Sequence, residues 1–261
     1  MCEKEIHKDT DLRKDMKIMR KLFCILMLPL AVVVDLVYLL HFRSCHRLTS
    51  FRHKVVYYGT ISVQGVGMRK SQIERNTKET QIKLELNLDG SGEGVVDTGI
   101  GFFNHMLELL KKHALIDLSV KAVGDIDVDY HHTVEDVGLV FGQALNAALG
   151  DRKGIVRYGF ASIPMDEALC EASLDLGGRP FTVVSSPMKH MFVRDFEVKL
   201  VEEFFRAVSV EGRCNVHLRQ IYGDEAHHVC EGLFKGFARA LRQAVKVDPA
   251  EKGVPSSKGV I

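Results

Sequence analysis

The sequence contains one succession of patterns twice, and this repetition restricts the chain to folds built from two similar halves. Residues 80–88 alternate apolar and polar side chains, as a half-buried strand does, and the turn DGSG follows them. Residues 170–176, followed by GGRP, repeat this design. Residues 118–125 have a counterpart in 217–224, and a His-His pair follows each within a few residues. Because the order is the same in both halves, the sequence predicts an internal duplication.

Two helices are predicted in each half. Apolar side chains recur at helical spacing in 133–149, after the first His pair, and in 229–245, after the second. The other two helices are predicted over 101–114 and 200–212. Each half then runs strand, strand, helix, strand, helix, with antiparallel strands connected too tightly for βαβ crossovers. The predicted fold class is α+β, with helices covering one face of each sheet.

Residues 1–67 differ in character from the rest of the chain. Residues 22–40 carry a single charge, Asp35, and a helix of this length would span about 28 Å, just enough for a bilayer core. This segment is a candidate membrane anchor or targeting segment. The alternative is an extension foreign to the working domain, such as a mis-set start, because Met68 opens a polar stretch suited to the beginning of a domain.

The working domain is therefore predicted over residues 68–261. Its two repeats are expected at about 72–163 and 164–250, followed by a short tail. Lys and Arg number 35 against 34 Asp and Glu, a net charge of +1, so the electrostatic footprint of a nucleic-acid-binding protein is missing. Six cysteines without a CxxC pair favour reduced thiols and a reducing compartment. We expect a cytoplasmic protein, or a plastid protein if the extension is a targeting segment.

An HHxxE motif opens the last predicted helix of each half, at 131–135 and at 227–231. Its first His and its Glu are four residues apart and therefore share one helical face, where they can bind one ion. These side chains are His131, Glu135, His227 and Glu231. The second histidines, His132 and His228, point about 100° further round and are free to serve a different ion.

Imidazole nitrogens combined with carboxylate oxygens suit Mn, Fe, Co, Ni or Zn, and the absence of nearby cysteines argues against a structural thiolate zinc site. One such motif is commonly only a surface His pair near a carboxylate. Two copies at matched positions of a duplication indicate a metal site.

Four motifs occur in order along the chain: TGIGFFNHM at 98–106, DYHHTVEDVG at 129–138, GDEAHHVCEG at 223–232 and PSSKGV at 255–260. Together they resemble the imidazoleglycerol-phosphate dehydratase family, an enzyme family of histidine biosynthesis, over about residues 68–261. The resemblance implies a duplicated fold of the ribosomal protein S5 domain 2-like type and two Mn²⁺ ions per active site, each held by three His and one Glu. For the first ion it implies His105, His132, His227 and Glu231. For the second ion it implies His131, Glu135, His217 and His228. His113 and His190 match no family position and are expected to be surface or helix-end histidines.

The resemblance also implies a reaction, the conversion of D-erythro-imidazole-glycerol phosphate to imidazole-acetol phosphate and water. The hydrogen that is lost is not beside a carbonyl, so the ring must supply electrons, as an imidazolate held by the two Mn²⁺ ions that expels the hydroxyl through a diazafulvene-like intermediate. Glu79 matches the family's acid/base; without the resemblance it reads equally well as a solvated strand-end residue.

Further site residues follow from the same resemblance. The phosphate-binding positions are Arg157, Arg179, Ser256, Ser257 and Lys258. A guanidinium fork is well shaped for phosphate. We expect Asp136, Asp166 and Glu167 to orient the histidine ligands.

The resemblance finally implies self-association, with trimers forming the metal sites between chains and a 24-subunit shell. Two other classes of protein remain open. The first is a non-catalytic dinuclear metal-binding protein, which would need neither the arginines nor the Ser-Ser-Lys tail. The second is a membrane-tethered interaction protein in which residues 22–40 matter most.

Overall fold

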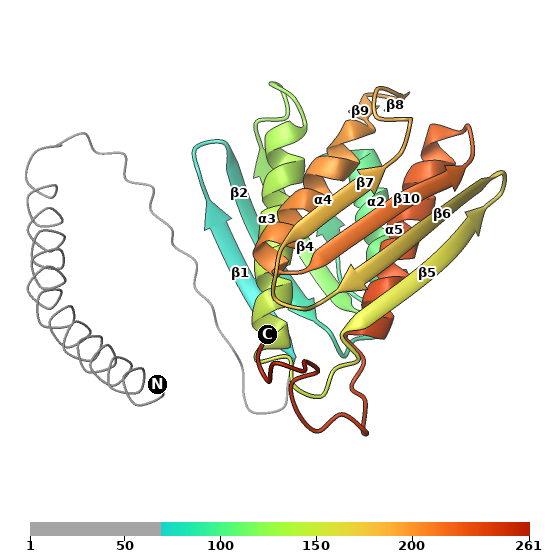
Figure 1. The fold of residues 1–261 in the computed structure, drawn as a ribbon. Coiled ribbons are helices and arrows are strands. Elements are labelled where there is room, and N and C mark those ends of the chain that lie inside the picture. Colours follow the sequence, from blue (N-terminus) through green and yellow to red (C-terminus); the bar gives the residue numbers. More distant parts are fainter. Residues whose placement is uncertain (1–68) are drawn as a thin grey trace, which may run out of the picture. The chain divides into compact units, whose positions relative to one another are not determined.

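The structure, a computed structural model, describes residues 69–261 (Figure 1). The expectations for the extension and for its segment 22–40 fall outside the described residues. None of the helices within 69–261 combines the length and the apolar character that crossing a bilayer requires.

Two halves of similar design follow each other along the chain. The first consists of β1 (Lys70–Asn76), β2 (Thr80–Asn87), β3 (Val96–Asp97), α2 (Gly101–Ala114), β4 (Asp117–Gly124) and α3 (His131–Leu149). The second consists of β5 (Tyr158–Met165), β6 (Ala168–Asp175), β7 (Phe181–Ser185), α4 (Lys199–Gly212), β10 (Asn215–Tyr222) and α5 (Ala226–Ala244). A small hairpin of β8 (Phe192–Val193) and β9 (Phe196–Glu197) precedes α4. The α+β class and the duplication are confirmed.

Each half forms one four-stranded sheet, in the order β1-β2-β4-β3 for the first sheet and β5-β6-β10-β7 for the second. Most neighbours are antiparallel, but β3 pairs in parallel with β4, and β7 pairs in parallel with β10. Since α2 joins β3 to β4 and α4 lies between β7 and β10, each half contains a parallel crossover. The expectation that tight connections exclude βαβ crossovers was wrong. It failed because β3 has only two residues, and because β7, with the sequence FTVVS, has no fully buried residue and no strict alternation of apolar and polar side chains.

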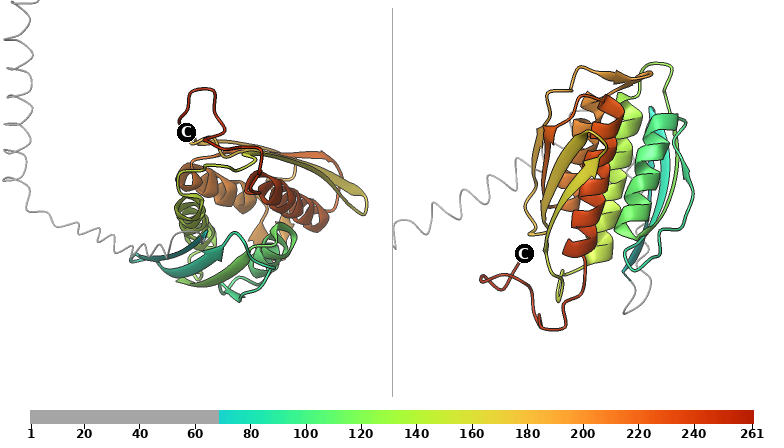
Figure 2. Two further views of the ribbon diagram at one scale, coloured as in Figure 1. Left: turned by 90° about the horizontal axis from the view of Figure 1, so that it is seen from below. Right: turned by 90° about the vertical axis from the view of Figure 1, so that its right-hand side faces the viewer.

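The four helices form one layer between the two sheets, as the view along the sheets shows (Figure 2). Helix α3 packs on β1 and β2, and α5 packs on β5 and β6. The halves meet where α3 packs on α4 and α2 packs on α5. The inner face of each sheet is therefore covered by helices, as predicted.

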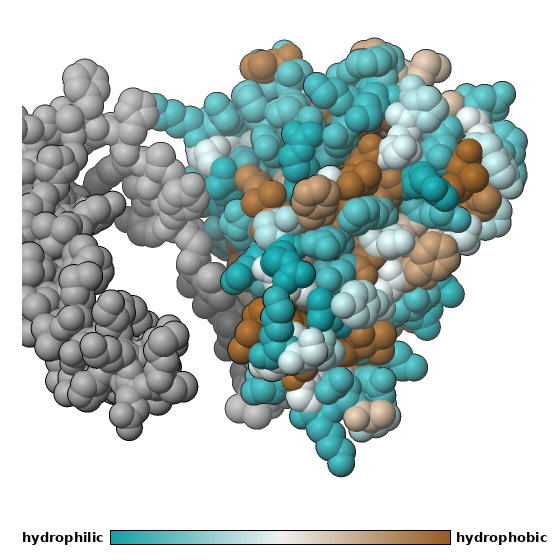
Figure 3. All heavy atoms as spheres, in the orientation of Figure 1, coloured by the Kyte–Doolittle hydropathy of each residue, from teal (hydrophilic) through white to brown (hydrophobic). Residues whose placement is uncertain are grey.

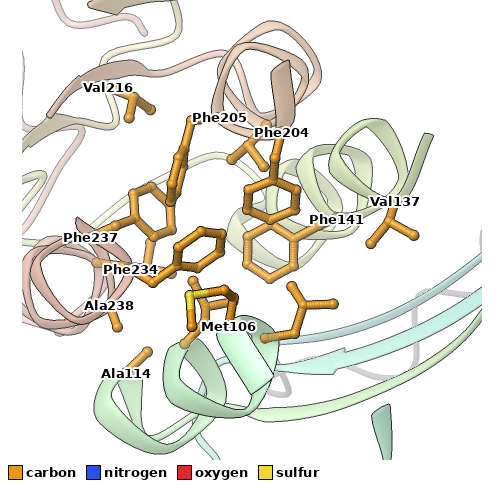
Figure 4. Close-up of a cluster of buried hydrophobic side chains, with 14 of the residues drawn as sticks. Met106, Ala114, Val137, Phe141, Phe204, Phe205, Val216, Phe234, Phe237 and Ala238 are labelled. Carbon is orange, nitrogen blue, oxygen red and sulfur yellow. The ribbon is translucent and has the colours of Figure 1, made fainter. Parts of the chain in front are cut away.

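The core lies where the four helices meet (Figure 4). The ring of Phe204 in α4 has its centroid 5.4 Å from that of Phe103 in α2, 6.3 Å from that of Phe141 in α3 and 5.5 Å from that of Phe234 in α5. All four side chains are fully buried. Burial of each stabilises the fold by about 1.5–3 kcal/mol, so this cluster holds the two halves together.

The outer faces of the two sheets differ in character. In the first sheet, β2 exposes polar residues such as Gln81, Lys83 and Glu85. In the second sheet, Phe160 of β5 and Phe181 of β7 are 53% and 61% exposed. Figure 3 shows this side of the molecule, with apolar residues among hydrophilic ones. The second sheet therefore offers the more apolar outer surface.

Candidate metal centre

Three predicted ligands meet where α2 packs on α5. The Oε1 atom of Glu231 lies 2.8 Å from Nε2 of His105 and 3.1 Å from Nε2 of His227. One ligand atom from each of these residues lies within 4.8 Å of the other two. His227 and Glu231 lie one turn apart on α5, as the motif spacing predicts, and His105 comes from α2. Two imidazole nitrogens and a carboxylate oxygen directed at one point are a donor set that fits a transition metal.

Glu231 is kept ionised for this role. Burial raises the pKa of its carboxyl, since its side chain is only 9% exposed, but hydrogen bonds from Lys235 and His105 outweigh burial and lower the pKa to about 2. The Lys235 Nζ contacts Oε2 of Glu231 at 2.5 Å, which leaves Oε1 for the histidine side of the cluster. The ammonium group of Lys235 thus stabilises an anion that faces the two imidazoles.

The first motif places a matching pair at the start of α3. Nε2 of His131 lies 3.5 Å from Oε2 of Glu135, and the two side chains are 41% and 46% exposed. The difference from the cluster on α5 lies in the carboxylate: the Glu231 side chain is 9% exposed, whereas His105 and His227, at 44% and 40%, are about as exposed as His131. Among the described residues, the group of His105, His227 and Glu231 is the one set of three potential ligands within reach of a single ion.

The second histidine of each motif has a carboxylate partner. Nδ1 of His132 lies 3.0 Å from Oδ2 of Asp125, and Nδ1 of His228 lies 2.7 Å from Oε2 of Glu167. These hydrogen bonds are the main cause that raises the pKa of each imidazole above its ordinary value. In both rings the partner occupies Nδ1, so Nε2 is the nitrogen left for a ligand bond.

Glu167 thus contacts a histidine, as expected for it, and Asp166 lies further off, with Oδ2 at 3.8 Å from Nε2 of His228. Asp136 behaves differently. Its carboxylate is ion-paired with Arg75 at 3.0 Å and accepts a hydrogen bond from the Thr80 hydroxyl. Asp136 therefore anchors β1 and β2 to α3, and the expected contact with a histidine is replaced by these two.

The predicted phosphate-binding residues gather at the opposite end of α5. The N–H of Arg157 donates to the carbonyl of Ala244, the last residue of that helix. The Arg157 guanidinium is ion-paired with Asp175 at 2.6 Å and donates to the Pro255 carbonyl at 2.7 Å, which brings the tail with Ser256, Ser257 and Lys258 alongside. The side chain of Asn215 donates to the carbonyl of Arg179 at 2.6 Å.

His217 lies near this second group. It is two residues after Asn215, on the outer face of β10, and its ring stacks on that of Phe181 with centroids 6.2 Å apart. His227 and Ala244 are seventeen residues apart on α5, a distance of about 26 Å along the helix. Within one chain, the cluster of His105, His227 and Glu231 therefore lies at a separate place from the group of predicted phosphate-binding residues and His217. The remaining two histidines lie outside both: His113 is half-buried near the end of α2, where burial is the main cause of its lowered pKa, and His190 is exposed.

Sequence reasoning missed two residues of this region, Asp125 and Lys235. Asp125 belongs to a Gly-Asp pair that recurs at Gly223-Asp224, so the duplication offered a signal for it. Lys235 follows Glu231 by four residues, a spacing at which oppositely charged side chains on a helix meet.

Comparisons with known proteins bear on this arrangement. The family model described as imidazoleglycerol-phosphate dehydratase matches residues 98–241. The imidazoleglycerol-phosphate dehydratase of Alkaliphilus metalliredigens is 56% identical over 186 residues, which cover 71% of this chain and 95% of that protein. The protein of the same name from Azorhizobium caulinodans is 51% identical over 195 residues, 74% of this chain and 99% of its own length.

Solved structures agree with the relatives found by sequence. The crystal structure of imidazoleglycerol-phosphate dehydratase from Staphylococcus aureus matches with a TM-score of 0.62 and 38% identity, over 68% of this chain and 99% of that one. The enzyme from Pyrococcus furiosus, solved in complex with (S)-C348, matches with a TM-score of 0.64 and 34% identity, over 72% of this chain and 99% of that one. The chain belongs to the imidazoleglycerol-phosphate dehydratase family, the hydro-lyases of histidine biosynthesis.

Proposed function

We propose that the chain converts D-erythro-imidazole-glycerol phosphate to imidazole-acetol phosphate and water, with two Mn²⁺ ions in each active site. The observation that carries this proposal is the cluster of His105, His227 and Glu231, which residues from two helices form. Lys235 contacts the Glu231 carboxylate of this cluster and keeps it ionised. Two bound divalent ions would act as Lewis acids that hold both nitrogens of the substrate's imidazole ring.

Each ion would take ligands from both HHxxE motifs. His132 would complete the coordination of the first ion beside His105, His227 and Glu231. The second ion would take His131 and Glu135 with His217 and His228. All eight are nitrogen or carboxylate oxygen donors, which suit manganese without any thiolate.

The separation of the two groups within one chain supports self-association. A three-carbon phosphate ester of imidazole is far shorter than the distance of about 26 Å between the ends of α5 that carry the metal cluster and Arg157. We therefore propose that the helix ends of one copy, with His105, His131 and His227, meet the outer face of the second sheet of another copy. The exposed aromatic side chains Phe160 and Phe181 fit such a contact, since large apolar patches mark interfaces. Trimers within a 24-subunit shell are the assembly we propose.

Glu79 is suited to proton transfer. It ends the turn between β1 and β2, its side chain is 57% exposed, and its Oε2 lies 4.0 Å from Nδ1 of His132. An exposed carboxylate beside the predicted metal ligands can take the proton from carbon and return one to the departing hydroxyl. Arg157, Arg179, Ser256, Ser257 and Lys258 would bind the phosphate.

We place the enzyme in the cytoplasm. Cys170, Cys214 and Cys230 are free thiols, and burial raises the pKa of each to about 12, so they stay protonated and unreactive. Membrane contact would require that segment 22–40 acts as an anchor, which fractionation of cells that express the full chain would test.

The test of the reaction is direct. The full chain, loaded with Mn²⁺ and assembled, is incubated with imidazole-glycerol phosphate, and the enolisable ketone is measured. Turnover that Glu79→Gln abolishes supports the dehydratase. Metal uptake without turnover would favour the alternative, a non-catalytic dinuclear metal-binding protein.

A further inference from the structure

Equivalent histidines in the two halves have carboxylate partners from different places. Nδ1 of His228 is bound by Glu167, which immediately precedes β6. Nδ1 of His132 is bound instead by Asp125, which immediately follows β4, with both carboxylate oxygens in reach at 3.0 and 3.2 Å. The duplication preserves the hydrogen bond to Nδ1 but changes its source.

The counterpart of Glu167 in the first half is Glu79. Each of these residues immediately precedes the second strand of its half, at the end of a hairpin turn. Glu167 lies 2.7 Å from its histidine, whereas Glu79 lies 4.0 Å from Nδ1 of His132. Their side chains are 38% and 57% exposed. The Glu79 carboxylate therefore lies farther from its histidine than the Glu167 carboxylate does.

In the first half, Asp125 instead accepts the hydrogen bond from Nδ1 of the histidine, and hydrogen bonds of its own backbone fix its position. Its N–H donates to the Glu79 carbonyl at 3.1 Å, and its own carbonyl accepts from Val128 at 2.8 Å. Its side chain is 25% exposed, less than that of Glu79. The counterpart of Asp125 in the second half, Asp224, is exposed, and there Glu167 serves the histidine. Each half thus offers two equivalent carboxylate positions, and the first half uses Asp125 to bind its histidine whereas the second half uses Glu167.

We propose that Asp125 is the positioning residue of His132, and that by accepting the hydrogen bond from Nδ1–H it leaves Nε2 for the ion and Glu79 free for proton transfer. A neutral imidazole has a single N–H, so the carboxylate that accepts it determines which nitrogen can bind metal. One carboxylate cannot both hold this N–H and move protons to and from a substrate. This assignment rests on the proposed function of the metal site.

The test compares Asp125→Ala with Asp224→Ala, the matched change in the second half. Mn²⁺ affinity and stoichiometry are measured on the assembled full chain by the EPR signal of free Mn²⁺. Loss of a ligand's carboxylate partner typically weakens metal binding 10–100-fold, so we expect Asp125→Ala to weaken one of the two ions by about that factor. Asp224→Ala should leave both affinities unchanged. Asp125→Asn, which keeps the shape and one acceptor oxygen, should recover part of the affinity.

A second comparison uses Glu79. In the otherwise unchanged chain, Glu79→Gln should leave Mn²⁺ affinity intact. In the Asp125→Ala background, the same change should weaken binding further, because Glu79 is then the nearest substitute for the lost carboxylate. Melting temperatures of all variants identify any that fail to fold.

Two results would overturn the assignment: Asp125→Ala that binds both ions as tightly as the unchanged chain, or Glu79→Gln alone that weakens one ion as much as Asp125→Ala does. Failure of the proposed reaction would look different. The unchanged chain would then bind Mn²⁺ with no turnover, whatever the Asp125 variants do to metal affinity.

Discussion

His217 and His227 lie on opposite sides of the second sheet. Helix α5, which carries His227, packs on the inner face of β5 and β6, while His217 stands on the outer face of β10 beside Phe181. If both histidines serve one active site, the site must combine two copies of the chain.

Complementation between copies should therefore restore activity. His217→Ala and His227→Ala chains should each be inactive alone, because each removes a proposed metal ligand from every site. When the two kinds of chain are coexpressed and assemble at random, about a quarter of the sites should combine an intact His227 from one chain with an intact His217 from another. Turnover of the copurified mixture, isolated through two different tags, measures this. The pair His227→Ala and Glu231→Gln, with both changes in one cluster, is the control that should stay inactive.

Glu231→Gln should weaken Mn²⁺ binding by at least about 100-fold, because even the partners of metal ligands contribute 10–100-fold. Titration of the metal-free protein with Mn²⁺ measures the effect. Glu108→Gln is the matched control on α2: this side chain is 47% exposed and paired with Lys111 rather than with a histidine. Equal affinities for the two variants would contradict the assignment of Glu231.

The metal-free protein should lose stability in acid through Glu231. The pKa of this carboxyl is about 2 in the folded chain, against an ordinary 4.5. A lowered pKa stabilises the fold above the unfolded value, and this contribution is lost as the pH falls from about 4.5 toward 2. The melting temperature of the unchanged chain should therefore fall more steeply over this range than that of Glu231→Gln, which cannot titrate there. Parallel curves would show that Glu231 is not the group responsible.

Arg179→Ala should impair substrate binding more than turnover. A hydrogen bond to a charged group contributes about 1.5–3 kcal/mol, so KM should rise by roughly 10–150-fold while kcat changes little. Lys153→Ala, at an exposed lysine paired with Asp151, should leave KM unchanged. An unaltered KM for Arg179→Ala would remove Arg179 from the phosphate site.

Phe204→Ala should destabilise the domain by about 3–5 kcal/mol, because it opens a cavity among rings from all four helices. At roughly 2–4 °C per kcal/mol for a domain of this size, the melting temperature should fall by at least about 6 °C. Val210→Ala, at a position on α4 that is 49% exposed, should cost less than about 0.5 kcal/mol. A small effect of Phe204→Ala would mean that the core collapses around the change.

Local spacing predicted what lies within one helix. The pairs His131–Glu135 and His227–Glu231 follow from the helical period, and the helix predicted over 101–114 coincides with α2. Periodicity could not predict that α2 packs on α5, which is what brings His105 to Glu231.

Longer-range features depended on information that no single segment contains. The parallel strand β3 is too short to produce an alternating pattern, so the crossovers went unpredicted. The contact between Asp125 and His132 depends on where a turn after β4 ends relative to the start of α3. Only the structure shows that the second sheet lies between His217 and the cluster on α5.

The aromatic cluster shared by the four helices has a consequence for the origin of the fold. Since Phe103 and Phe141 come from one repeat and Phe204 and Phe234 from the other, a lone repeat would leave its half of the cluster in contact with water. In this chain the second repeat covers it. A homodimer of single repeats would bury the same surface, and fusion of two gene copies would join such a dimer into one polypeptide.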